Sequence, residues 1–159
     1  MPVKQLPAQL ITPENFKPYG QVIYPICHDK FYDKDDAQLI LDRGIPRFYI
    51  MHLTYKKLKF HKITRHNQCT QCLGSLAGKE WLIVLAPPTD TNKPIIDNIS
   101  AFRIPGNCFI KLHLGTWHAG PYFYDDFVDF YNLELSDTNI NDHETCNLLT
   151  TYNLELEII

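Results

Sequence analysis

Frequent prolines and glycines divide this chain into short apolar segments, and this pattern limits its fold more than any other feature. Eleven Pro and seven Gly interrupt a sequence that also holds nine Tyr, nine Phe and two Trp. Aromatic and β-branched residues favour strands, and closely spaced breakers leave little room for long helices. The sequence therefore predicts an all-β fold of many short strands, arranged as a sandwich or barrel.

The positions of these segments predict the individual elements. One short helix is expected near the start, with Thr12 as its cap, Pro13 in its first turn, and Pro18 and Gly20 at its end. The segment 47–58 has apolar side chains on both faces, which is typical of a strand buried on both sides. The segment 29–43 is compatible with a helical turn or with a loop. The expected strands span residues 21–26, 47–58, 81–85, 108–114, 127–135 and 152–159.

Length and charge narrow the class of protein. The 159 residues predict a single domain over 1–159, and the net charge of −3 argues against binding to nucleic acid or to an anionic membrane surface. The longest apolar run, residues 81–86, is far too short to cross a membrane, and residues 1–16 do not resemble a signal peptide. A cytoplasmic location is therefore expected. The five cysteines, an odd number, predict no disulfide framework.

The segment 108–114 carries the first polar cluster. In a strand, Lys111 and His113 share one face while Ile110 and Leu112 share the other. The polar face is either the solvent side of a sheet or the lining of a polar cavity. The run that follows brings a second histidine, His118, beside glycines and a proline, and functional groups often lie on such loops.

The segment 64–71 carries a second polar cluster. Arg65 and His66 are adjacent there, and a guanidinium next to an imidazole suits a carboxylate ligand. Cys69 and Cys72 have the spacing of half a zinc site, but no second pair follows, so both are interpreted as structural.

The spacing of His66, Gln71 and Gly78 is similar to the first cupin motif, with Gln71 in the position of its Glu, and His113 matches the single His of the second motif. This resemblance implies a cupin-like double-stranded β-helix, a jelly-roll barrel. It also implies a metal site at His66, Gln71 and His113. Because Gln71 is neutral, this site would bind a divalent metal only weakly, so no cofactor is assigned with certainty.

Within the cupins, the chain resembles the ureidoglycolate lyases. The matching blocks lie at residues 14–20, 65–66 with 70–71, 83–87, 101–102, 113 with 117–118, and 129–130. The resemblance implies a homodimer that cleaves ureidoglycolate to glyoxylate and urea in purine-derived ureide breakdown. A small-molecule carboxylate is then the expected partner.

The reaction needs a base for the substrate hydroxyl and an acid for the leaving nitrogen, and histidine suits both roles. On this hypothesis, the catalytic residues are His113, His118 and His66. The residues expected to bind substrate are Arg65, Gln71, Lys111 and Trp117. Asp129 is expected to be a supporting residue that fixes the tautomer of a histidine.

Other interpretations remain open for the chain and for single residues. The chain could be a non-catalytic cupin that binds a small carboxylate, or a related enzyme with another small-acid substrate. Trp117 fits a packing role better than a catalytic one. His66 could cap a surface turn, and Asp129 could lie on a solvated sheet face.

Overall fold

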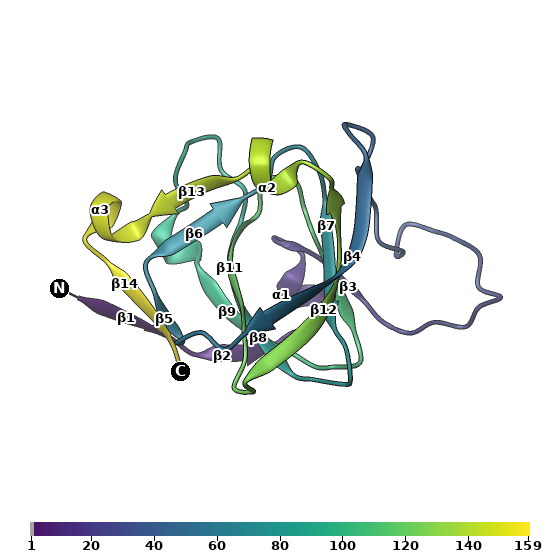
Figure 1. Ribbon diagram of the computed structural model, residues 1–159, viewed down its shortest axis with the longest axis horizontal. Coiled ribbons are helices and arrows are strands. Elements are labelled where there is room, and N and C mark those ends of the chain that lie inside the picture. The colour runs from purple at the N-terminus through teal and green to yellow at the C-terminus, as the bar shows by residue number, and fades with distance from the viewer. Residues whose placement is uncertain (1) are drawn as a thin grey trace.

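Over residues 2–159, the computed structural model has fourteen strands, three short α-helices and one 3-10 turn, arranged in three sheets (Figure 1). The six-stranded sheet has the order β13 (Glu144–Asn147), β6 (Lys62–Arg65), β11 (Trp117–Tyr122), β8 (Trp81–Ala86), β9 (Ser100–Ile104) and β2 (Ala8–Leu10). The five-stranded sheet has the order β3 (Gly20–Ile23), β10 (Phe109–Leu112), β7 (Gln71–Ser75), β12 (Phe127–Leu135) and β4 (Pro46–Thr54). The three-stranded sheet has the order β1 (Val3–Leu6), β14 (Glu155–Ile158) and β5 (Lys59–Phe60). The helices are α1 (Pro13–Phe16), α2 (Thr138–Asn141) and α3 (Leu148–Tyr152), and the 3-10 turn is η1 (Ile96–Asn98).

This architecture confirms the predicted all-β, cupin-like fold. Neighbouring strands are antiparallel, except that β1 runs parallel to β14 and β2 runs parallel to β9. The strands of the described residues are divided among separate sheets, so they do not close into one hydrogen-bonded barrel. No helix in residues 2–159 has the length and apolar character to span a bilayer.

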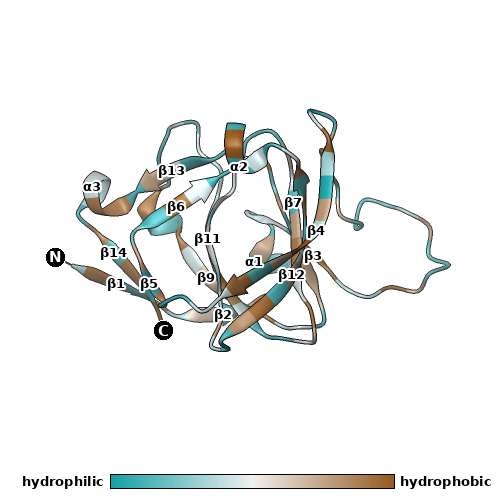
Figure 2. Ribbon diagram, viewed as in Figure 1, coloured by the Kyte–Doolittle hydropathy of each residue, from teal (hydrophilic) through white to brown (hydrophobic). Residues whose placement is uncertain are grey.

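Two hydrophobic cores lie on opposite sides of the six-stranded sheet, because successive side chains of a strand point to opposite faces. On β8, Ile83 and Leu85 pack toward the five-stranded sheet, whereas Leu82 and Val84 pack with residues of β1 and β14. Figure 2 shows hydrophobic residues concentrated along the strands of these layers. The space between the two large sheets, called here the inter-sheet core, therefore has one apolar wall from each sheet.

The predicted N-terminal helix is confirmed. Thr12 accepts a hydrogen bond from the Asn15 backbone N–H, and the Asn15 side chain accepts one from the Thr12 backbone N–H. The prediction of a strand over 152–159 is correct only for its second half, because Tyr152 ends α3 and Asn153 follows with φ of 51°. The strand predicted over 127–135 matches β12.

The prediction that 47–58 is buried on both faces is wrong. This segment forms β4, an edge strand that ends at Thr54. Tyr49, Met51 and Leu53 face the inter-sheet core, whereas Phe48 and Ile50 are 67% and 55% exposed on the outer face of the five-stranded sheet.

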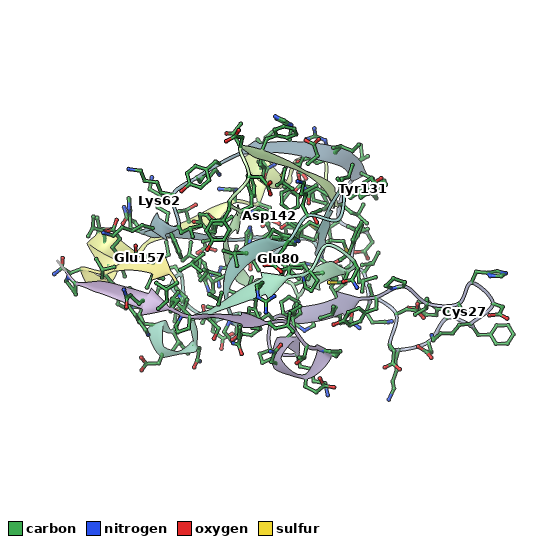
Figure 3. All side chains as sticks on the ribbon, turned by 90° about the horizontal axis from the view of Figure 1, so that it is seen from below. Cys27, Lys62, Glu80, Tyr131, Asp142 and Glu157 are labelled. Atoms are coloured by element: carbon green, nitrogen blue, oxygen red, sulfur yellow. The ribbon has the colours of Figure 1, made fainter. Side chains whose placement is uncertain are left out.

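The segment between β3 and β4 forms turns and loops, with neither helix nor strand in residues 24–45. It projects from the body of the molecule, and Cys27 lies far out on it (Figures 1 and 3). Its returning part lies against the five-stranded sheet. Gln38 and Asp36 hydrogen-bond to the Gln21 side chain, and the backbones of Ile40 and Thr70 are joined.

Candidate active site

A polar cavity of about 190 Å³ opens at one end of the inter-sheet core. The inward faces of strands from both sheets line it, together with Lys56 after β4, Asn139 of α2 and His143 between α2 and β13. The lining residues are Tyr49, Met51, Leu53, Lys56, His66, Gln71, Leu73, Ile83, Leu112, His118, Gly120, Pro121, Asn132, Glu134, Asn139 and His143. Drug-sized ligands usually occupy pockets of about 300–1,000 Å³, so this cavity suits a smaller metabolite.

Two of the predicted catalytic histidines meet in this cavity. His66 follows the last residue of β6, and His118 lies on β11, which pairs with β6 through His118 and Thr64. The two rings are 4.9 Å apart between centroids, and the His143 ring is 5.6 Å from that of His66. His118 therefore belongs to a strand, not to the loop predicted for it.

Backbone carbonyls hold one nitrogen of each ring. His66 Nδ1 lies 2.5 Å from the Asp142 carbonyl oxygen, and His118 Nδ1 lies 3.4 Å from the Thr116 carbonyl oxygen. A carbonyl oxygen only accepts, so in both rings Nδ1 carries the hydrogen. In the neutral form, Nε2 of each ring is then an unprotonated acceptor.

Burial keeps these imidazoles neutral. Loss of solvent around His118, together with its His66 and His143 neighbours, lowers its pKa to about 3, although the hydrogen bond to the Thr116 carbonyl opposes this shift. Burial also lowers the pKa of His66, although the Asp142 carbonyl and the charges of Asp142 and Glu134 oppose this shift. At neutral pH the cavity therefore holds two adjacent neutral imidazoles.

A hydrogen-bonded chain of side chains forms the opposite wall. Gln71 Nε2 donates to Asn132 Oδ1 at 2.9 Å, and Asn132 Nδ2 donates to the Tyr49 hydroxyl at 3.2 Å. The Tyr49 hydroxyl donates to Glu134 Oε1 at 3.1 Å, and Asn139 Nδ2 donates to the same oxygen at 3.3 Å. Predicted substrate-binding residue Gln71 thus belongs to the site, as one end of this chain.

Arg65 and Trp117, both predicted to bind substrate, lie behind the cavity. They point to the opposite side of the six-stranded sheet from His66 and His118, and neither lines the cavity. Arg65 forms an ion pair with Glu144 through Nε at 2.8 Å and through a second nitrogen at 3.2 Å, and it packs over the Trp117 ring. Trp117 is fully buried, so its packing interpretation is confirmed.

Lys111 and His113 lie on the outer face of the five-stranded sheet, away from the cavity. Lys111 Nζ donates to His113 Nδ1 at 3.0 Å, and His113 Nε2 donates to the Lys17 carbonyl oxygen at 3.1 Å. Burial lowers the pKa of both groups. Lys111 is covered because its strand lies between β3 and β7, where the segment containing Asp36–Ile40 crosses the sheet. His113 therefore lies outside the cavity, although it borders a narrow crevice together with His66, Gln71 and His118.

Asp129 lies on this outer face as well. Its Oδ1 is 2.6 Å from Nδ1 of His52, an exposed histidine that packs beside the Phe127 ring. Asp129 therefore fixes the orientation of a histidine, but this histidine does not line the cavity.

The metal site predicted at His66, Gln71 and His113 does not fit the structure. Both ring nitrogens of His113 are engaged by Lys111 and Lys17, so His113 has no free lone pair for a metal. Among the described residues, no group of three His, Cys, Asp or Glu side chains is placed to hold a metal ion. The residues that do line the cavity are suited to proton transfer and hydrogen bonding.

Sequence reasoning missed several residues of the cavity. Asn132 and Glu134 lie on the same inward face of β12 as the buried residues Val128 and Phe130. Polar residues at such positions of an otherwise apolar face could have indicated a polar site. Tyr49 shares the inward face of β4 with apolar residues in the same way. The remaining members, Lys56, Asn139 and His143, lie outside strands and carried no periodic signal.

A cupin-like β scaffold with a small polar cavity at one end of its core defines a class of small-molecule-binding proteins. The sequence model of the family described as ureidoglycolate lyase matches residues 3–155, so the chain belongs to the ureidoglycolate lyase family. Comparison with curated proteins gave no match. Family membership makes the chain a lyase that acts on a small molecule.

Proposed function

We propose that the chain cleaves ureidoglycolate to glyoxylate and urea in this cavity, with His66 and His118 handling the proton. One observation carries the proposal: two neutral imidazoles lie 4.9 Å apart in a small polar cavity, and backbone carbonyls hold their Nδ1 atoms. Their Nε2 atoms are left as the proton acceptors of the site.

The reaction moves a single proton. The substrate hydroxyl loses its proton, its C–O bond becomes the carbonyl of glyoxylate, and the C–N bond breaks with its electron pair on nitrogen. That nitrogen takes a proton and leaves as urea. One imidazole can perform both steps, because the proton that it accepts from oxygen is the proton that nitrogen requires.

His66 is the better proton carrier of the pair. The pKa of His118, lowered to about 3, makes that imidazole a weak base in the empty cavity. The pKa of His66 is held up by the Asp142 carbonyl and by the negative charge of Glu134, so its protonated form is better supported. His118 then accepts a hydrogen bond from the substrate or from the imidazolium of His66.

Lys56 is placed to attract the substrate carboxylate. It follows β4 and is the one Lys or Arg among the described residues that line the cavity. Arg65, predicted for this role from the sequence, already pairs with Glu144 on the other side of β6. A lysine at a solvent-exposed position acts mainly as a point charge that steers an anion.

Glyoxylate release from ureidoglycolate tests the proposal. Replacing His66 with Asn should lower kcat/KM by about 10²- to 10⁴-fold, the usual contribution of a general acid–base residue. Replacing His118 with Asn should lower it less, because His118 only accepts a hydrogen bond. Circular dichroism of each variant controls for folding. Wild-type protein that binds ureidoglycolate without releasing glyoxylate would instead support the non-catalytic cupin. Release of glyoxylate by both variants at the wild-type rate would remove the histidines from the mechanism.

We also propose that the chain forms a homodimer through the outer face of the five-stranded sheet. Phe48, Ile50 and Phe127 are each more than half exposed on this face, and such an apolar patch favours association. Sedimentation of the wild type at twice the monomer mass, and of Ile50→Glu at the monomer mass, is the expected result. A monomeric wild type would overturn this proposal.

A further inference from the structure

Glu134 is a buried carboxylate that has no cation beside it. Only 1% of its surface is exposed, and none of the eight ion pairs found among residues 2–159 includes it. Burial of an unpaired charge is costly, and such groups normally find a partner. Because Glu134 lines the cavity, a ligand can supply that partner.

The hydrogen bonds of Glu134 leave one oxygen available. Tyr49 and Asn139 both donate to Oε1, and no described residue donates to Oε2. Another acceptor that lacks a donor lies at the other end of this chain of side chains. Gln71 is 8% exposed, and its Oε1 is buried without a hydrogen-bond partner.

The direction of the hydrogen bonds explains why acceptors are left over. The amide of Gln71 donates to Asn132, which donates to Tyr49, which donates to Glu134. Each donor group of this wall makes one hydrogen bond within the wall, whereas Glu134 Oε2 and Gln71 Oε1 accept none. A ligand that completes the site has to bring N–H or O–H groups, because a ligand with acceptors or methyl groups would leave both oxygens unpaired.

We infer that Glu134 Oε2 and Gln71 Oε1 bind the N–H groups at the ureido end of the substrate, and that Glu134 makes the site select a carbamoyl group over an acyl group. This inference rests on the proposed function for the identity of the substrate. A ureido group ends in an NH₂ whose hydrogens match an acceptor-rich wall, and its carboxylate end remains free to face Lys56.

The site distinguishes the carbamoyl group from a near-isosteric acyl group because the acyl group leaves a protein oxygen without a hydrogen bond. An acetyl group has a methyl where the carbamoyl group has its NH₂, and it cannot donate to a carboxylate. A site built to hydrogen-bond a polar group rejects the analogue that lacks it, because the buried polar atom of the protein stays unpaired. The loss of one hydrogen bond to a charged group lowers the affinity for a ligand by about ten- to hundred-fold.

Two ligands without the reactive hydroxyl test this inference by calorimetric titration: N-carbamoylglycine and N-acetylglycine. Neither can be cleaved, so their binding is measured whether or not the chain releases glyoxylate, and failure of this inference is distinct from failure of the proposed function. Wild-type protein should bind N-carbamoylglycine at least tenfold more tightly. Equal affinity for the two ligands would overturn the inference without any variant.

Glu134→Gln makes the sharpest variant. Tyr49 and Asn139 both donate to Oε1, so the oxygen of the new amide would keep that place and its NH₂ would replace Oε2. A donor would then face the N–H groups of the ligand. We expect a loss of at least tenfold in affinity for N-carbamoylglycine and less than threefold for N-acetylglycine.

Two further variants complete the test. Tyr49→Phe removes a donor to Glu134 without changing its charge, and it should lower the preference for N-carbamoylglycine by a smaller factor. Glu80→Gln changes an exposed carboxylate that pairs with Arg103 and should leave both affinities unchanged. Glu134→Gln or Tyr49→Phe protein that weakens both ligands equally would indicate a structural role and overturn the inference.

Discussion

The two faces of the five-stranded sheet carry similar side chains in different surroundings. On the inner face, Gln71, Asn132 and Glu134 join into one network that borders the cavity. On the outer face, Lys111 pairs with His113, and Asp129 pairs with His52 in a separate contact. Each face therefore has polar groups of the kinds used in catalysis, but only the inner face places them next to His66 and His118.

The difference shows that neighbouring residues of one strand belong to separate chemical environments. Leu112 lines the cavity while Lys111, one position earlier, lies on the other side of the sheet. Residue type identified candidate groups, and strand alternation decided which of them share a site. The following predictions test this contrast, in order of decreasing effect.

Truncation of one aromatic residue on each face should give the largest contrast. Phe130 is fully buried on the inner face and packs edge-on against Trp81, so Phe130→Ala should lower the free energy of unfolding by about 3–5 kcal/mol. Phe48 is 67% exposed on the outer face of a single chain, so in the monomeric Ile50→Glu background Phe48→Ala should change it by less than about 1 kcal/mol. Urea unfolding measures both values, and similar losses would contradict the assignment of the faces.

Stability should fall as the pH is lowered from 8 to 5, because the folded protein keeps His118 neutral. The pKa of His118 is lowered to about 3, whereas in the unfolded chain it is about 6.5. Below pH 6.5 the unfolded chain binds a proton that the folded chain does not, so stability is fully present above this range and is lost toward the folded pKa. This histidine alone should remove about 2 kcal/mol by pH 5.

The variant His118→Asn tests that assignment. It should flatten the change in unfolding free energy between pH 8 and 5. His113→Asn, on the outer face, should flatten it in the same direction but less, because the pKa of His113 is also lowered, by a smaller shift. Denaturant unfolding at each pH gives the slopes, and an unchanged slope in His118→Asn would show that this histidine is not buried in its neutral form.

Substitutions on the outer face of the five-stranded sheet should have the smallest effect, which is their effect on activity. His113→Gln keeps a group that can donate to the Lys17 carbonyl and should change kcat/KM for ureidoglycolate by less than about threefold, because His113 does not line the cavity. Asp129→Asn should behave in the same way. A loss of about a hundredfold in either variant would place the outer face in the reaction and return His113 to the role predicted from the sequence.

Much of the fold was predictable because short-range patterns specify it. Thr12 and Pro13 marked the start of α1, and the strand predicted over 127–135 has the bounds of β12. The exposed outer face of β4 was not predictable, because an apolar residue such as Phe48 has the same appearance in a sequence whether it is covered or not.

The candidate site was predictable only in part. His66, His118 and Gln71 were identified from local clusters and from the family resemblance, and they meet in the cavity. Whether Arg65 or its neighbour His66 faces the cavity depends on the register of β6 against β11, which the sequence does not show. Asn139 of α2 and His143, which lies between α2 and β13, enter the cavity through tertiary packing, without a local signal.

Asp142 connects two parts of the site that are far apart in the sequence. Its carboxylate accepts hydrogen bonds from the backbone N–H groups of Asn67 and Gln68, and its carbonyl oxygen accepts one from His66. During synthesis on the ribosome, His66 emerges long before this partner, so the tautomer of His66 is fixed only after residue 142 has been translated. A nascent chain that stops before residue 142 would therefore have most of the scaffold but no working site.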